Sequence, residues 1–137
     1  MKRFLLILLV FVAVLSACSA QESRSLVGSW ELIEFGPVGA TMPAVEDSGA
    51  GLTFNEDGSV SGSTGCNGAG SEYTVDGDQI EFAPFVSTLM ACEDPIMEQE
   101  STFHQVLNGT ASYEIDGDTL TLSRDGMVLV FTAAQAK

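Results

Sequence analysis

Apolar and polar residues alternate along most of the chain, in short runs that turn residues separate. Such alternation is typical of strands that bury one face. Glycine and aspartate stand between the runs, where tight turns need positive φ angles or side chains that bond the local backbone. The pattern predicts strands over Ser29–Phe35, Leu52–Phe54, Val60–Gly62, Tyr73–Val75, Gln79–Phe82, Ser112–Ile115, Thr119–Leu122 and Met127–Thr132.

Two of the predicted hairpins resemble each other. Tyr73–Phe82 has the sequence YTVDGDQIEF and Tyr113–Leu122 has the sequence YEIDGDTLTL. The similarity ends with the hairpins, so we interpret it as two similar turns rather than as a solenoid repeat. Gly36–Gly49, which contains two prolines, is predicted to be a loop.

One helix is predicted among the strands. Asp94 is a favourable N-cap and Pro95 suits the first helical position. Asn108-Gly109 is a typical helix end. Between these ends, apolar residues recur at helical spacing, and they are Ile96, Phe103, Val106 and Leu107.

About eight short strands and one helix predict a mainly β (α+β) fold. We expect a compact antiparallel barrel or half-barrel, with the helix covering an open end or an edge. A barrel of this size is filled by large inward side chains. The candidates are Trp30, Phe54, Phe82, Phe85, Phe103 and Phe131.

The first residues have the plan of a secretory signal peptide: a basic start and then an apolar run, Phe4–Leu15. This run is shorter than the roughly 20 residues that span a membrane, and it lacks the polar face of a buried core helix. Leu15-Ser16-Ala17-Cys18 resembles a bacterial lipobox. It predicts cleavage after residue 17 and lipidation of Cys18, whereas the alternative is an ordinary signal peptide followed by a chance cysteine.

Charge and length limit what the mature chain can bind. The 137-residue chain has 5 Lys+Arg, 19 Asp+Glu and a formal charge of −14. Cleavage would remove Lys2 and Arg3 and bring the charge to −16, which disfavours nucleic acid and anionic lipid. Residues 18–25 would form a tether of at most roughly 25 Å, followed by one domain over 26–134. Ser19 after the cysteine favours the outer membrane, with the domain facing the periplasm.

Cys66 and Cys92 would remain after lipidation of Cys18, and an exported chain resides where disulfides form. We therefore predict a Cys66–Cys92 bond, which the chain-entropy model values at about 3.5 kcal/mol. Free thiols are the alternative, and zinc would need more ligands than two cysteines. Several glycines surround Cys66 and make its loop intrinsically flexible, so we expect the bond to hold Gly65-Cys66-Asn67 beside Met90-Ala91-Cys92.

Other candidate sites are weaker. Glu100 and His104 lie one helical turn apart and could form a metal pair, but a surface hydrogen bond is the simpler interpretation. The Asp-Gly-Asp segments lack the longer oxygen pattern of a calcium loop. No G-x-S-x-G motif, P-loop or dinucleotide motif occurs, so we expect no catalytic, metal or cofactor site.

Four segments, taken together, are similar to the META domain family, which contains the HslJ-like heat-shock lipoproteins. They are LVGSWEL over Leu26–Leu32, GSTGCN over Gly62–Asn67, TLMAC over Thr88–Cys92 and the hairpin that starts at Tyr113. The resemblance implies a lipocalin-like β-barrel with one helix, a place in the cell envelope and a link to heat and antibiotic tolerance. It implies no biochemical activity.

These observations lead to two functional hypotheses. The first is a monomeric, non-enzymatic envelope lipoprotein that supports stress tolerance by binding another envelope protein. Asn67 and Met90 are the candidate exposed contact residues. The alternative is a barrel that holds a small apolar ligand, which would need a hollow interior rather than one filled by aromatic side chains.

Overall fold

The strands of the sheet are connected mainly by short turns. The computed structural model describes residues 24–135, so the predicted signal peptide and Cys18 lie outside the described residues. The helix α1 (Asp94–Val106) lies between β7 and β8 in the sequence. The strands are β1 (Gly28–Pro37), β2 (Met42–Pro43), β3 (Gly51–Phe54), β4 (Ser59–Ser63), β5 (Gly68–Asp76), β6 (Gln79–Phe82), β7 (Val86–Ser87), β8 (Thr110–Asp116), β9 (Thr119–Arg124) and β10 (Met127–Ala133).

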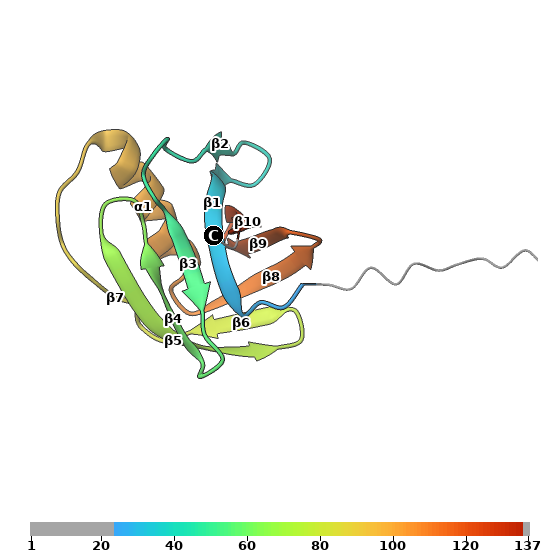
Figure 1. Cartoon of the computed structure of the whole chain (residues 1–137). Helices are drawn as coiled ribbons and strands as arrows, with labels where there is room; N and C mark the ends of the chain where they lie inside the picture. The colour runs from blue at the N-terminus through green and yellow to red at the C-terminus, as the bar shows by residue number, and fades with distance from the viewer. Residues whose placement is uncertain (1–23, 136–137) are drawn as a thin grey trace, which may run out of the picture.

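Eight strands form a closed antiparallel barrel in the order β1, β3, β4, β5, β6, β8, β9 and β10 (Figure 1). The ring closes because β10 pairs with β1, which places Leu32 opposite Phe131. The register shifts between Leu32 and Glu34, where β1 carries an irregularity of the β-bulge kind. Closure protects the edges of these eight strands. The predicted barrel is confirmed, and the half-barrel is excluded.

Both Asp-Gly-Asp segments form the predicted tight turns. Pairing in the β5–β6 hairpin runs up to Asp76 opposite Gln79, so only two residues form the turn. The φ angle is 61° at Gly77 and 58° at Gly117. Glycine adopts such angles without the clash that a Cβ causes, and type II′ hairpin turns need one at this position. The local sequence therefore determines both turns.

The β3–β4 turn is held by Asp57. Its Oδ1 accepts hydrogen bonds from the Ser59 hydroxyl at 2.6 Å and from the Ser59 N–H at 2.9 Å. The hydroxyl and then the amide lower the pKa of Asp57 below its ordinary value of 3.8. On β5, burial and the charge of Asp57 raise the pKa of Tyr73, whose hydroxyl donates to the Asn55 carbonyl.

The glycine-rich segment around Cys66 forms the end of β4, a tight turn and the start of β5, so its strands extend further than predicted. Gly62 belongs to β4, and β5 begins at Gly68, which leaves a tight turn closed by a 2.9 Å bond from Thr64 N to Asn67 O. A Cβ on Gly62 would collide with the Gly51 carbonyl of β3. Glycine is required here because the two strands approach closely, and not because the chain is loose.

The barrel interior is filled by the predicted side chains. Phe85 is partly buried at the edge of the core, whereas the other five aromatic candidates are buried. The Trp30 indole donates to the Leu26 carbonyl at 2.8 Å, which satisfies its polar atom. The remaining core is aliphatic and includes Leu52, Val60, Ile80, Leu120, Leu122 and Leu129.

Helix α1 packs against β1, β9 and β10. Its Phe103 ring contacts the buried Phe131 edge-on, with ring centroids 6.0 Å apart, so the helix adds to the barrel core. The predicted span is nearly correct, but the N-cap is Glu93 rather than Asp94. The Glu93 side chain makes no capping hydrogen bond to the first turn. Pro95 in the first turn starts the helix instead.

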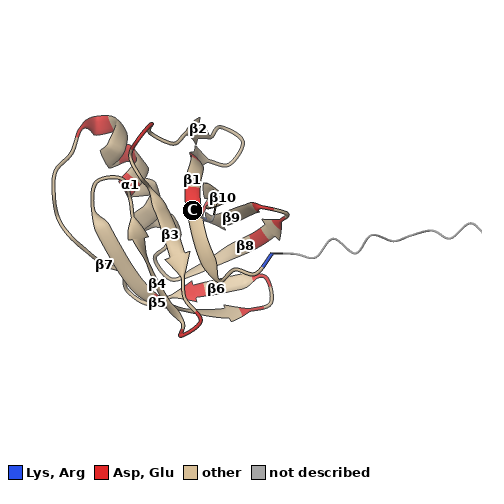
Figure 2. Ribbon diagram, in the orientation of Figure 1, with Lys and Arg blue, Asp and Glu red and all other residues tan. Residues whose placement is uncertain are grey.

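Acidic residues lie at the hairpin tips and near the start of α1 (Figure 2). Only two cations fall within the described residues: Arg24, which pairs with Asp118 at 2.7 Å, and Arg124, which pairs with Asp125 at 3.3 Å. Within residues 24–135, no helix is both long and apolar enough to cross a membrane.

Candidate functional site

Cys66 and Cys92 form the predicted disulfide. Their Cα atoms are 6.0 Å apart, and the bond joins the β4–β5 turn to the segment that leads into α1. We call the region around it the disulfide corner, defined by residues 64–67, residues 88–92 and the helical residues Gln99 and Glu100. In this structure the thiols are bonded rather than free. The described residues contain no group of three or more potential metal-ligating side chains.

Asn67 is the hub of the disulfide corner. Its Nδ2 donates to the Met90 carbonyl at 3.1 Å and to Glu100 Oε1 at 2.7 Å. Its Oδ1 accepts from the Met90 N–H at 2.7 Å and from the Thr88 hydroxyl at 2.9 Å. The amide thus pairs with both backbone groups of Met90, as a neighbouring strand would.

The prediction that Asn67 is exposed is wrong, because only 2% of the residue is accessible. A primary amide can donate two hydrogen bonds and accept two, and all four are satisfied here inside the protein. Met90 is exposed as predicted. Asn67 therefore holds the backbone from which the Met90 side chain projects.

Gln99 is a buried polar residue that sequence analysis missed. Its Oε1 accepts from the Val45 N–H at 2.9 Å, and its Nε2 donates to the Thr64 carbonyl at 2.7 Å. The side chain thus connects α1 both to the β2–β3 loop and to the β4–β5 turn. Its position four residues before Phe103, on the apolar face of the helix, is the signal that could have revealed it.

Glu100 and His104 lie on the same side of α1, but their environments differ. Glu100 is buried and bonded by Asn67, whereas His104 is half-exposed. His104 Nε2 lies 3.6 Å from Glu100 Oε1, which is longer than a hydrogen bond. The predicted surface hydrogen bond is therefore wrong, because the carboxylate turns inward to Asn67.

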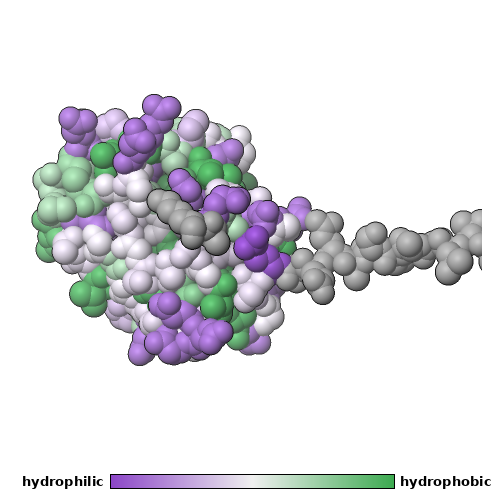
Figure 3. All heavy atoms as spheres, in the orientation of Figure 1, coloured by the Kyte–Doolittle hydropathy of each residue, from purple (hydrophilic) through white to green (hydrophobic). Residues whose placement is uncertain are grey.

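Large apolar side chains are exposed beside the disulfide corner. We call this surface the apolar loop, and its members are Val86, Leu89, Met90 and Met97. Leu89 is 94% exposed and Val86 is 77% exposed. Hydrophobic surface gathers at the left edge of Figure 3, where the β7–α1 connection runs in Figure 1. A groove with a volume of about 420 Å³ runs from Leu89 and Met90 to His104.

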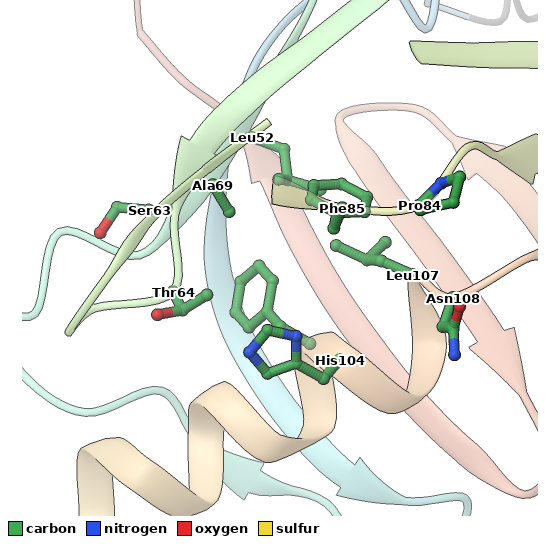
Figure 4. A pocket seen from close by; sticks show the side chains of 10 residues that line it. Leu52, Ser63, Thr64, Ala69, Pro84, Phe85, His104, Leu107 and Asn108 are labelled. Atoms are coloured by element: carbon green, nitrogen blue, oxygen red, sulfur yellow. The ribbon is translucent and has the colours of Figure 1, made fainter. Parts of the chain in front are cut away.

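A second hollow, with a volume of about 240 Å³, lies on the other side of His104, between α1 and strands β3 to β5. We call it the helix cavity. Figure 4 shows Phe85 and Pro84 on one side, Ser63 and Thr64 on the other, and His104 rising from the helix. The residues that line it are Leu52, Ser63, Thr64, Ala69, Pro84, Phe85, Phe103, His104, Leu107 and Asn108.

A family model described as the META domain matches residues 24–136. The chain belongs to the META domain family. This match confirms the resemblance that the four sequence segments indicated, and it covers the whole barrel. The family assignment places the disulfide corner and both hollows within a META domain.

Solved structures show the same fold. A protein from Burkholderia xenovorans, solved by NMR, matches with a TM-score of 0.64 and 23% identity over 80% of this chain and 83% of that one. A lipocalin-like protein from Bacteroides uniformis matches with a TM-score of 0.54 and 16% identity over 80% and 98%. No curated protein matches the chain. The META domain here therefore has a lipocalin-like barrel.

Proposed function

We propose that this META domain protein is a lipid-anchored envelope protein that supports tolerance of heat or antibiotic stress by binding another protein through its apolar loop. Cys18 would carry the lipid, and the outer membrane would be the site of anchoring. The proposed action is binding rather than catalysis. The observation that carries the proposal is the exposure of the four apolar side chains on a rigidly held backbone.

Exposed apolar clusters of this kind mark interaction surfaces, because water contact with them is unfavourable until a partner covers them. Leu89 is 94% exposed and Met90 is 58% exposed, so both side chains are available for contact. The backbone beneath them is fixed by the disulfide and by the Asn67 bonds to Met90. A fixed loop loses little conformational entropy when a partner binds, which favours affinity.

The position of the apolar loop favours a protein partner over the membrane. The described chain begins at Arg24, which is paired with Asp118 at the β8–β9 turn, and the apolar loop lies at the opposite edge of the molecule (Figure 1). With a short tether, the loop would face away from the anchoring membrane. The acidic composition opposes contact with anionic lipid as well.

The polar groups of the disulfide corner support a binding role over a catalytic one. Asn67 and Gln99 use both ends of their amides within the protein, and Glu100 accepts one of these bonds. Groups engaged in this way hold the loop in place and are not directed at a substrate. The alternative hypothesis, a barrel hollow enough for an apolar ligand, is less well supported because Phe54, Phe82 and Phe131 occupy the interior.

A paired substitution tests the proposal in a host strain that lacks the chain. Leu89→Asp with Met90→Asp should abolish the restored survival under heat or antibiotic, since both side chains are exposed and their replacement leaves the core intact. Val38→Asp is the matched control, because Val38 is 65% exposed but lies on the β1–β2 loop. It should restore survival fully.

Three controls make the result decisive. Both variants should melt at the wild-type temperature, both should reach the same membrane fraction, and mass spectrometry of the mature chain should find an acylated Cys18. Full survival with the Leu89/Met90 variant would contradict the role of the apolar loop. A mature chain that begins after Cys18 and carries no lipid would contradict the lipid anchor, but not the role of the apolar loop.

A further inference from the structure

The strand side of the helix cavity includes part of a row of paired residues, most of which are small. Pairing places Leu52 of β3 opposite Gly62 of β4, Gly62 opposite Ala69 of β5, and Ala69 opposite Ser87 of β7. Directly paired residues in an antiparallel sheet point to the same face. Of this row, Leu52 and Ala69 line the cavity, and the small side chain of Ala69 leaves space that a larger residue would occupy.

On the strand side, Leu52 and Ala69 supply apolar surface to the cavity, whereas Gly62 does not line it. The helix side of the cavity is apolar as well, since Phe103 and Leu107 line it. The cavity has a volume of about 240 Å³ and opens to solvent, since its lining residues Pro84, His104 and Asn108 are exposed. Small-molecule sites are typically hollows of this kind, mainly apolar with a few polar groups.

We propose that the helix cavity binds a small, neutral, mainly apolar molecule that carries one hydroxyl or carbonyl group. A water-sized group occupies about 30 Å³, so the cavity holds about eight non-hydrogen atoms. The apolar part lies between Ala69, Phe85 and Leu107, and the polar group lies toward Ser63, His104 and Asn108. This site is separate from the proposed protein contact through the apolar loop.

The charges around the cavity select a neutral ligand over an anion. Neither Arg24 nor Arg124, the two cations of the described residues, lines the cavity. The one ionisable lining side chain is His104, and the Glu100 carboxylate lies 3.6 Å from its ring. An anionic head group would lose its hydration without gaining an unshared cation. Hydroxyl and carbonyl groups can instead exchange hydrogen bonds with a serine hydroxyl, an imidazole and an amide.

A chain-length series of 1-alkanols from 1-butanol to 1-decanol tests the site. The protein is the mature chain with Cys18→Ser, so that no detergent competes for the cavity, and binding is followed by the amide NMR signals. Affinity should rise about fourfold per added methylene while the cavity fills. It should reach a maximum near about seven carbons, the length that the volume allows, and then fall.

The shifted signals should belong to Ser63, Ala69, Phe85 and Leu107, and not to the β8–β9 hairpin. Octanoate should bind at least about tenfold more weakly than 1-octanol, because a carboxylate costs more to bury. Ala69→Leu should fill the cavity and lower affinity at least about tenfold, whereas Ala40→Leu, which adds the same bulk to the exposed β1–β2 loop, should not. If circular dichroism shows that Ala69→Leu does not fold, the chain without this substitution tests the proposal. The tests are then its affinity maximum along the alkanol series and the set of residues whose amide signals shift.

Three results would overturn the proposal: affinity that still rises at 1-decanol, shifts centred on Leu89 and Met90, or no saturable binding by any alkanol. The outcome is independent of the proposed protein contact. The Leu89→Asp, Met90→Asp variant should bind 1-heptanol with the affinity of the protein that carries the wild-type loop. Loss of stress tolerance in that variant with intact alkanol binding would separate the two surfaces.

Discussion

The hairpin turns and the disulfide corner are ordered by contacts of different range. In the β5–β6 and β8–β9 hairpins, the turn residues and the strands that they connect are neighbours in the sequence. In the disulfide corner, Asn67 bonds groups more than 20 residues away, at Met90 and Glu100. The hairpins need only a residue that tolerates positive φ, whereas the corner needs the barrel to bring three segments together.

This difference shows which region depends on the rest of the fold. A hairpin turn can form wherever its few residues occur, so its exposed acidic tip has little influence on the rest of the fold. The corner joins α1, the β4–β5 turn and the segment before the helix through buried polar groups. A partly satisfied polar network in such a place would cost more than an apolar one, so loss of one member should affect the whole corner.

Removal of the disulfide, which lies in the corner and not in the hairpins, should cause the largest loss of stability. Cys66→Ala with Cys92→Ala should lower the free energy of unfolding by about 3.5 kcal/mol, because the unfolded chain gains conformations. The melting temperature should fall by roughly 10 °C or more. Calorimetry measures both. Reduction of the wild-type protein should reproduce the loss and leave the double variant unchanged, and equal melting of the oxidised and reduced forms would contradict the stabilising role.

Truncation of Asn67 should have the next largest effect. Asn67→Ala leaves the Met90 peptide group and the buried Glu100 carboxylate without their partner, which should cost about 2–3 kcal/mol. Amide exchange should accelerate at residues 88–92 and stay slow in the β8–β9 hairpin. Asn108→Ala is the control, because Asn108 is exposed and its replacement should cost less than about 0.5 kcal/mol. Equal losses of unfolding free energy in the two variants would contradict the role of Asn67 as the hub of the disulfide corner.

The smallest effect should follow from a change in the β3–β4 turn. Ser59→Ala removes the hydroxyl that donates to Asp57, so the pKa of Asp57 should rise toward its ordinary value of 3.8. Because the folded pKa is lowered, the stabilisation that this bond gives is present above pH 3.8 and is lost as the pH falls through the folded pKa. NMR titration of the Asp57 carboxyl carbon measures the change. An unchanged or lower pKa in the variant would contradict the assignment.

Much of the barrel could be predicted from the sequence because its elements are local. Alternation located the eight strands of the ring, and Asp-Gly-Asp located two of its turns. Two short strands escaped prediction: β2, inside the predicted loop, and β7, where only two residues pair. The first half of β5 also escaped prediction, since its glycines lack the side chains from which alternation is recognised.

The site was less predictable, because burial of a polar side chain depends on where its partners lie. Asn67 in a glycine-rich turn has the composition of an exposed loop residue, yet it is enclosed by the segment 88–92 and α1. Gln99 lies on the same helix face as Phe103. A polar residue on this apolar face is a signal that the sequence itself contains. Its two backbone partners, Val45 and Thr64, lie too far along the chain for any local pattern to name.

The sequence by itself determined the turns, the strand pattern, the family and the pairing of two cysteines in an exported chain, because these depend on backbone geometry, local spacing and composition. The tertiary structure alone decided that β10 closes on β1, that Asn67 turns inward while Met90 stays outside, and that the helix cavity lies between α1 and strands β3 to β5. Each of these depends on the register between distant strands. A one-residue change of register moves a side chain from the core to the solvent, and local patterns do not fix it.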